Sequence, residues 1–280
     1  MTFRKTILLL LLLLLTFVQG AGAQEYISFN DGIMTQYVGA DPYDSGADIV
    51  FMSSLNGKTG TFSLGNRTLY KDDSWNTLCL PFNVTINNVN NGILYGAEAR
   101  TLSSATFADG TLTLTFSDPV NELQAGVPYI IRWDEDSDLE NPNFGSVTLN
   151  TALNPVTDNV WIDFVGNYEA VSLSADDRTV LYLGTNNTLY YPHADMTIGL
   201  CRARFVLKNG LTAGDKTSEV RAFVLNFGEG EETGIKSLSP DPSPSREGSD
   251  YWHTLDGRRL AGKPTHAGVY IINGKKVVTK

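Results

Sequence analysis

Short runs in which apolar and polar residues alternate dominate this 280-residue chain. In "FADGTLTLTF", Leu112, Leu114 and Phe116 alternate with threonines, and Asp109-Gly110 supplies the turn before the second strand. Successive strand side chains point to opposite faces, so this period indicates strands with one buried face. Such runs recur at intervals of roughly 8–12 residues with turn residues between them, which is typical of a β-sandwich or barrel.

The same pattern extends along most of the chain. It predicts a hairpin in "VLYLGTNNTLYY", turning at Gly184–Asn187, and a turn at Asn209-Gly210. Further strands are expected in "DIVFMSSL", "NTLCLPF", "GILYGAEAR", "GVPYIIRW", "FGSVTLN", "VWIDFVGNY" and "VRAFVLNF". No strand alternates with a helical pattern, which disfavours a parallel βαβ sheet. The sequence therefore predicts an all-β fold, an antiparallel β-sandwich (jelly-roll-like) body with a small C-terminal β-hairpin module.

The N-terminus reads "MTFRKTILLLLLLLLTFVQGAGAQ". Two basic residues, Arg4 and Lys5, precede an apolar run and then small residues, the order of a secretory signal peptide cleaved between Ala23 and Gln24. The apolar run is shorter than the ~20 residues of a spanning helix. We therefore expect export through the inner membrane and no transmembrane helix in the mature chain.

The composition changes after Phe227 to Gly, Glu, Ser and Pro, and alternating prolines favour an extended spacer. The final thirty residues then read as two short hairpins, turning at Asp256-Gly257 and Asn273-Gly274. The expected domains are a signal peptide (1–23), a body of one sandwich or two sub-lobes (24–236), a Pro/Ser-rich linker (237–250) and a C-terminal tail (251–280).

The tail resembles the C-terminal sorting signal of the type IX secretion system of Bacteroidetes. The matching residues are Tyr251, Leu255, Asp256, Gly257, Arg258, Gly268, Tyr270, Ile271, Lys276, Val277, Val278 and Lys280, and Asn273 and Gly274 form the turn between its last two strands. The resemblance implies a small β-module that the outer-membrane export machinery recognises and usually removes, although this tail is shorter than the fullest versions. It implies delivery to the outer surface or the medium.

The body also resembles a module that is common in secreted Bacteroidetes proteins of unknown role. The resemblance rests on "NRTLYKDDSWNTLCLPFNV", "LQAGVPYIIRW", "DFVGNYEAV", "LYLGTNNTLYYP" and "VRAFVLNFGE". It implies a β-rich fold and an outward destination, and it implies no functional residue.

The chain carries a net charge of −10, which excludes the basic face that nucleic-acid binding needs. Its two cysteines, Cys79 and Cys201, leave two interpretations open: buried small apolar residues, or a disulfide in an exported chain. The run "CRARFVL" predicts that Cys201 shares a strand face with Ala203, Phe205 and Leu207.

Residues for catalysis or metal binding do not form a recognisable pattern. His193 lies near Asp195, but there is no Gly-x-Ser-x-Gly elbow and no distinctive carboxylate pair. We therefore expect no enzyme, no catalytic residue, no metal site and no cofactor. The acidic loop "WDEDSDLEN" is expected to be a solvated loop, and a calcium site is the alternative interpretation. Its acidic residues are Asp134, Glu135, Asp136, Asp138 and Glu140.

Flat aromatic side chains on a β-sandwich can stack on sugar rings, and the candidates are Trp133, Trp161, Tyr190 and Tyr191. Core packing is the competing role for each of them. The expected function is an exported cell-surface or secreted binding protein, an adhesin or glycan-binding module that meets glycan or a host surface. The alternatives are a structural component of the cell envelope or of a fimbria-like assembly and, third, an extracellular polymer-degrading enzyme.

Overall fold

The computed structural model describes residues 24–43, 49–86, 92–134, 137–158, 160–214, 219–228, 236–240, 252–254, 268–272 and 275–279. The chain divides into two compact units, a body up to Pro240 and a tail unit from Asp241 to Lys280. Strands make up nearly all the regular structure of the described part. Its helical segments are two 3₁₀ turns, η1 (Met52–Leu55) and η2 (Thr185–Asn187). The predicted all-β fold is confirmed.

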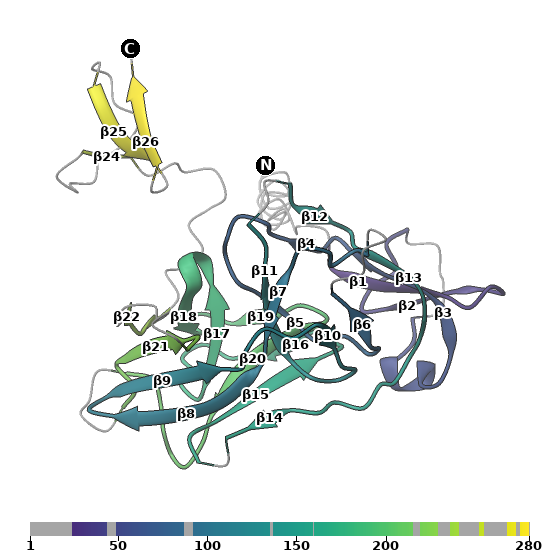
Figure 1. Cartoon of the computed structure of the whole chain (residues 1–280), viewed down its shortest axis with the longest axis horizontal. Helices are drawn as coiled ribbons and strands as arrows, with labels where there is room; N and C mark the ends of the chain where they lie inside the picture. The colour runs from purple at the N-terminus through teal and green to yellow at the C-terminus, as the bar shows by residue number, and fades with distance from the viewer. Residues whose placement is uncertain are drawn as a thin grey trace, which may run out of the picture. The chain divides into compact units, whose positions relative to one another are not determined.

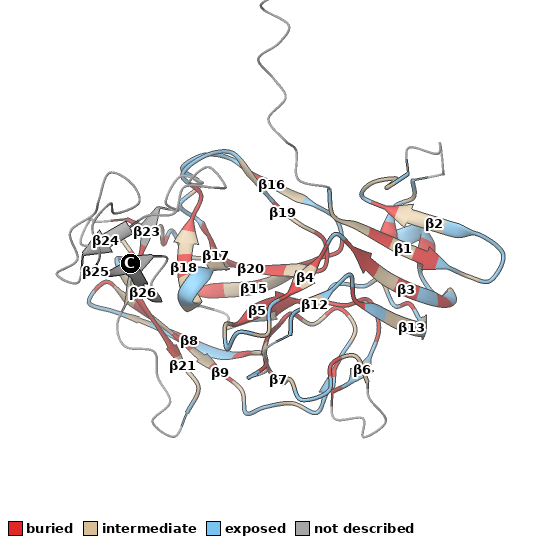
Figure 2. Ribbon diagram, turned by 90° about the horizontal axis from the view of Figure 1, so that it is seen from above, coloured by how far each residue is buried: buried red, intermediate tan, exposed pale blue. Residues whose placement is uncertain are grey.

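The N-terminal sheet has four antiparallel strands in the order β13-β3-β1-β2. Their bounds are β1 (Tyr26–Asn30), β2 (Thr35–Val38), β3 (Thr59–Gly65) and β13 (Asn143–Thr148). The alternation of "YISFN" explains the two faces of β1, because Ile27 and Phe29 are buried whereas Ser28 and Asn30 are not. Figures 1 and 2 show this sheet at one end of the body.

A small central sheet has the order β5-β11-β7, with β5 (Asn76–Leu78), β11 (Tyr129–Arg132) and β7 (Glu98–Arg100). Two further sheets have two short strands each. They are β10 (Glu122–Leu123) with β6 (Val84–Thr85), and β12 (Leu139–Glu140) with β4 (Thr68–Leu69).

The rest of the body is built on a six-stranded sheet, a second four-stranded sheet and a short ribbon. The six-stranded sheet has the order β14 (Val156–Thr157), β15 (Ile162–Asn167), β20 (Arg202–Leu207), β17 (Val180–Gly184), β18 (Thr188–Tyr191) and β23 (Ser239–Pro240). The second four-stranded sheet has the order β22 (Lys236–Ser237), β21 (Ala222–Asn226), β9 (Thr111–Phe116) and β8 (Leu102–Ala108). The ribbon pairs β16 (Val171–Leu173) with β19 (Met196–Ile198).

Two large hydrophobic clusters form the interior of the body. The first core lies against the N-terminal sheet and includes Ile27, Phe29 and Phe62. The second core includes Phe164 and Phe205, whose stacked rings lie 4.4 Å apart between centroids. Figure 2 shows buried segments along the strands of both regions.

Strand β11 belongs to both cores. Tyr129 and Ile131 are buried in the first core, whereas Ile130 between them is buried in the second. A strand that is apolar on consecutive positions is covered on both faces. The "YII" run therefore places the central sheet between the two cores.

Several sequence predictions can be compared with these elements. The hairpin at Asp109-Gly110 and the turn through Gly184–Asn187 are confirmed. The strand expected in "DIVFMSSL" is wrong, because this segment holds an isolated bridge at Ile49 and then the 3₁₀ turn η1. The sheets are mostly antiparallel, yet β21 pairs with β9 in parallel although long stretches of chain separate them.

The start of the expected linker belongs to the body. Ser237 lies opposite Ala222 on β21, and β23 pairs in parallel with β18. Residues 241–250 lie outside the described residues, as does the expected signal peptide up to Ala23. Gln24 is the first described residue.

The tail unit is a three-stranded antiparallel sheet in the order β24-β25-β26. Its strands are β24 (Trp252–Thr254), β25 (Gly268–Ile272) and β26 (Lys275–Thr279). This confirms a small C-terminal β-module. Gly268 and Tyr270 of the expected sorting motif lie on β25. The motif residues that lie outside the described residues are Tyr251, Leu255, Asp256, Gly257, Arg258, Asn273, Gly274 and Lys280.

Among the described residues, no helix has the length and apolar character needed to cross a bilayer.

Candidate functional site

The four aromatic residues predicted to stack on sugars do not meet at one surface. Trp133 is buried in the first core, where its Nε1 donates a hydrogen bond to the carbonyl oxygen of Tyr95 at 3.1 Å. Tyr191 is buried in the second core. Neither ring offers a free face to a ligand, so both serve the core-packing role that the sequence left open.

Trp161 and Tyr190 are partly exposed and lie on different elements. Trp161 precedes β15 and packs against Phe107, with ring centroids 5.7 Å apart. Tyr190 lies on β18 beside Tyr182 and covers Gly184, where an added Cβ would come within 2.8 Å of its ring. These two rings remain candidates, but the structure does not join them into a site.

The other candidate residues are also dispersed. His193 and Asp195 are exposed in the loop before β19, and the Asp195 carboxylate accepts a hydrogen bond from the Ala175 amide at 2.8 Å. In the acidic loop, Glu135 and Asp136 lie outside the described residues. Among the residues that are described, no group of three or more His, Cys, Asp or Glu is placed to hold a metal ion.

The outward face of the N-terminal sheet collects aromatic side chains that the sequence analysis did not single out. Tyr26 on β1 and Tyr37 on β2 make an edge-to-face contact, with centroids 5.8 Å apart. Tyr43, which follows β2 and is 73% exposed, contacts Tyr37 in the same way at 6.4 Å. We call this surface, with the outward polar residues of the sheet, the tyrosine face.

The backbone beneath Tyr26 fixes the position of its ring. Tyr26 lies opposite Gly65 on β3, and a Cβ added to Gly65 would lie 2.0 Å from Cζ of Tyr26. The ring therefore lies directly over the glycine, and any residue with a Cβ at position 65 would clash with it. Burial, followed by the nearby Tyr43 hydroxyl, raises the pKa of Tyr26 above its ordinary value.

Uncharged hydrogen-bonding groups lie beside the tyrosines on the strands. Beyond the end of β2, the Asp41 carboxylate accepts a hydrogen bond from the Tyr43 amide at 3.0 Å. Burial, then Tyr43, then this carboxylate raise the pKa of Tyr37 above its ordinary value. Register places Ser28 next to Tyr37 and Ser63, and places Asn30 next to Thr35 and Thr61. The Asn30 amide donates to the Thr35 hydroxyl at 2.9 Å. None of the described strand residues on the outward face carries a formal charge; they are Tyr26, Ser28, Asn30, Thr35, Tyr37, Thr59, Thr61, Ser63, Gly65, Asn143, Ser146 and Thr148.

Period-two reading of "YISFN" and "TQYV" shows which residues of each strand share a face. It does not show that β1 pairs with both β2 and β3. The sequence pattern does not reveal strand pairing, and it is this pairing that brings Tyr26, Tyr37 and Gly65 together from separate stretches of chain.

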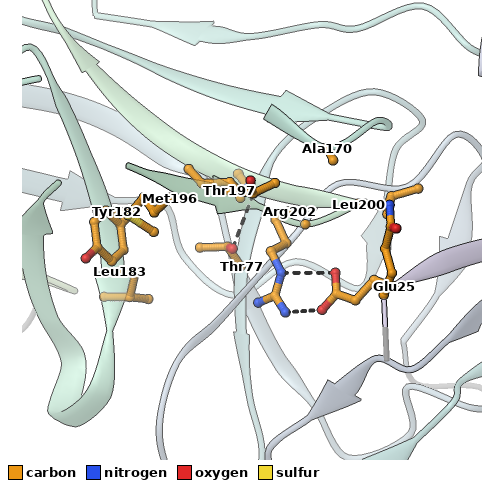
Figure 3. Close-up of a pocket in the computed structure, with 13 residues that line it drawn as sticks. Glu25, Thr77, Ala170, Tyr182, Leu183, Met196, Thr197, Leu200 and Arg202 are labelled. Atoms are coloured by element: carbon orange, nitrogen blue, oxygen red, sulfur yellow. Dashed lines mark hydrogen bonds and ion pairs between the residues drawn. The ribbon is translucent and has the colours of Figure 1, made fainter. Parts of the chain in front are cut away.

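A second candidate is a cavity of about 420 Å³ lined by residues of β5, β17, β19 and β20 and by Glu25 (Figure 3). Its charged residues are Glu25 and Arg202, whose carboxylate and guanidinium form an ion pair in the lining of the cavity. Thr77, Leu183 and Arg202 also line a neighbouring cavity of about 510 Å³. Arg202 thus lies where the two cavities meet, and we call the pair the Arg202 cavity.

The charges around Glu25 in the Arg202 cavity are already neutralised by one another. Glu25 also lies 3.7 Å from the buried guanidinium of Arg67, whose Nη2 donates to the Thr77 carbonyl oxygen at 3.1 Å. Gly199 leaves room for the carboxylate, because an added Cβ there would lie 1.9 Å from Glu25 Oε2. No His, Cys or Ser is among the described residues that line the cavity around Glu25.

A further charged cluster closes the end of the central sheet. Glu98 accepts hydrogen bonds from Arg132 at 2.7 and 2.9 Å and is also paired with Arg100. Arg132 lies 4.8 Å above the ring of Trp75, which stacks on Phe227. Burial alone would raise the pKa of Glu98, but the hydrogen bonds from the two arginines lower it below its ordinary value.

Comparison of the chain with protein-family models, with curated proteins and with solved structures found no match in any of the three.

Proposed function

We propose that the body is a non-catalytic binding module that holds neutral saccharides on the tyrosine face. The observation that carries this proposal is the row of three tyrosines, Tyr26, Tyr37 and Tyr43, beside uncharged hydroxyl and amide groups. An aromatic ring presents an apolar face to the C–H groups of a sugar, and its hydroxyl adds a polar contact. Serine, threonine and asparagine supply the hydrogen bonds that sugar hydroxyls need.

The surroundings of the tyrosine face support an interaction surface. Ile33 in the β1–β2 turn is 90% exposed, and Phe51 is 72% exposed just after the bridge at Ile49. Large apolar side chains gathered at one end of a body mark a contact surface more often than scattered ones do. Figure 2 shows the β1–β2 turn as an exposed loop at that end.

The absence of charge on the described strand residues selects the ligand class. A surface without arginine or lysine gives no counter-charge to a polyanionic glycan. A surface without a carboxylate pair gives no general acid and base for cleaving one. The chemistry therefore favours binding of a neutral polymer over its hydrolysis.

Affinity electrophoresis in gels that contain a soluble neutral polysaccharide (galactomannan, xyloglucan or mixed-linkage glucan) tests this proposal. At least one should retard the body, and Tyr37→Ala should weaken binding about tenfold, about 1.4 kcal/mol. Tyr95→Ala is the matched control, since Tyr95 is an exposed tyrosine outside this sheet. Failure of every neutral polysaccharide, or equal binding by the wild type and Tyr37→Ala, would overturn the proposal.

We further propose that the chain is exported to the outer surface or the medium. The N-terminal charge–apolar–small order and the resemblance of the tail to a sorting signal support this destination. Cells that produce the full chain should show the body outside, and cells that produce a chain ending at residue 250 should retain it in the periplasm. Equal localisation of the two chains would show that the tail has no sorting role.

A further inference from the structure

Cys201 has a backbone conformation that is unusual for its residue type. Nine of the described non-glycine residues have a positive φ, and eight of them are asparagine or aspartate. The exception is Cys201, with φ 52°. Asparagine and aspartate tolerate the left-handed region, whereas other side chains enter it at a cost of order 1 kcal/mol or more. The backbone preference of cysteine therefore does not account for its place at this turn.

The turn brings Cys201 beside the other cysteine. The Cys79 amide donates a hydrogen bond to the Cys201 carbonyl oxygen at 3.1 Å, and the Ala203 amide donates to the Thr77 hydroxyl at 3.2 Å. The backbone hydrogen bond between the two cysteines holds them side by side. A disulfide requires this proximity, since the Cα atoms that it joins lie roughly 4.4–6.8 Å apart.

Both thiols occupy the same interior. Cys79 and Cys201 are fully buried members of the first core, and both are free cysteines in this structure. A Cβ added to Gly166 would lie 2.2 Å from the Cys79 sulfur, so glycine makes room for that sulfur beside β20. The expectation that Cys201 would share a face with Ala203, Phe205 and Leu207 is wrong, because those three residues lie in the second core.

We propose that Cys79 and Cys201 form a disulfide as the exported chain folds, and this step rests on the proposed export for its oxidising compartment. Each thiol loses a proton, an Sγ–Sγ bond forms, and the two electrons reduce the disulfide of the oxidant, such as oxidised glutathione, to two thiols. The bond links β5 to the turn before β20. It joins two segments that the chain separates by well over a hundred residues.

Burial decides when the reaction takes place. Desolvation raises the pKa of the Cys79 thiol to about 12, and it also raises that of Cys201. A buried protonated thiol is a poor nucleophile, so the folded reduced protein oxidises slowly. The cross-link must form while the chain is still open to the oxidant.

The test compares refolding with folded protein. Reduced, unfolded chain is refolded in oxidised glutathione, then denatured, alkylated and weighed. We expect a monomer with a mass 2 Da below the reduced chain and no alkylated cysteine, and a Tm higher by roughly 10 °C than after reduction. Folded reduced chain in the same buffer should keep both thiols for much longer. Alkylation of both cysteines after oxidative refolding would overturn the proposal.

Two controls separate this pairing from export. Cys79→Ala and Cys201→Ala should each leave one thiol that is alkylated or bound to glutathione, whereas disulfide-linked dimers of the wild type would overturn intramolecular pairing. The same mass measurement on chain isolated from a bacterial periplasm addresses the compartment. A cross-link that forms in glutathione but is missing from protein made with its signal segment would uphold the pairing and contradict export.

Discussion

The tyrosine face and the Arg202 cavity are both lined with polar side chains, but they differ in what those side chains already contact. In the cavity, the Glu25 carboxylate is paired with both Arg202 and Arg67. On the tyrosine face, the polar groups of the strands are neutral hydroxyls and amides at the solvent side of a sheet, and the one carboxylate beside the tyrosines in the described part is Asp41. Charges that neutralise one another stabilise the fold, and they leave a ligand little to gain. Neutral groups exchange water for sugar hydroxyls at a small cost.

The largest expected effect tests the structural role of the cavity. Glu25→Gln leaves the Arg67 guanidinium, which is 2% exposed, without its carboxylate. We expect the free energy of unfolding to fall by about 2–3 kcal/mol, because a buried charge loses its partner. Urea denaturation measures this loss, and saccharide binding should stay within about twofold of the wild type.

Glu122→Gln is the matched control for this variant, because Glu122 is an exposed carboxylate on β10. It should change stability by less than about 0.5 kcal/mol. Equal stability of the two variants would show that the Glu25 pairs contribute no more than a surface charge. A strong loss of saccharide binding in Glu25→Gln would move the binding site to the cavity.

The next effect tests how the tyrosine face is positioned. Gly65→Ala places a methyl group where the Tyr26 ring lies, so the ring must move off the sheet. We expect a stability loss of about 1–2 kcal/mol and a binding loss of about five- to tenfold. A double-mutant cycle with Tyr26→Ala, read by urea denaturation and affinity electrophoresis, assigns the cause. If the ring is the obstacle, Gly65→Ala should cost little once Tyr26 is alanine; additive losses would refute the contact.

The smallest effect concerns the charged cluster at Glu98. As in the cavity, its carboxylate forms ion pairs with neighbouring arginines. The pKa of Glu98 is lower in the folded chain than its unfolded value of about 4.3. Its contribution to stability is therefore present above that unfolded value and is lost as the pH falls through the folded pKa. Urea midpoints measured from pH 6 to pH 3 should fall less steeply for Glu98→Gln than for the wild type. Parallel pH profiles would show that the arginine pairs add no stability.

Much of the local structure could be predicted because it depends on neighbouring residues. Asp109-Gly110 sets a turn between two alternating strands, and Leu112, Leu114 and Phe116 are buried as their period requires. The segment around Phe51 failed for the same reason, since its apolar residues resemble a strand although the chain forms a 3₁₀ turn there. Apolar character alone does not distinguish a short turn from a strand.

The candidate site could not be predicted, because it depends on strand pairing. Trp133 and Tyr26 look alike in sequence, as single aromatic residues within or beside strands. Only the placement of β11 and its neighbours between two cores buries Trp133, and only pairing with Gly65 holds Tyr26 on an outward face. The position of Cys201 also depends on the three-dimensional fold. The alternating pattern predicts that it shares a strand face with Ala203, but it lies in a turn and is buried in the first core.

The burial of β11 by both cores has a consequence for how the body comes apart. Removing either core would expose one side of the "YII" run to water, so neither half of the body retains a stable interior alone. The two regions should melt in a single transition, and the β11 amides should be among the last to exchange with deuterium. A protease that cuts an outer loop would therefore leave a nicked body whose pieces stay associated. The N-terminal sheet, which carries the tyrosine face, should not fold as an independent module.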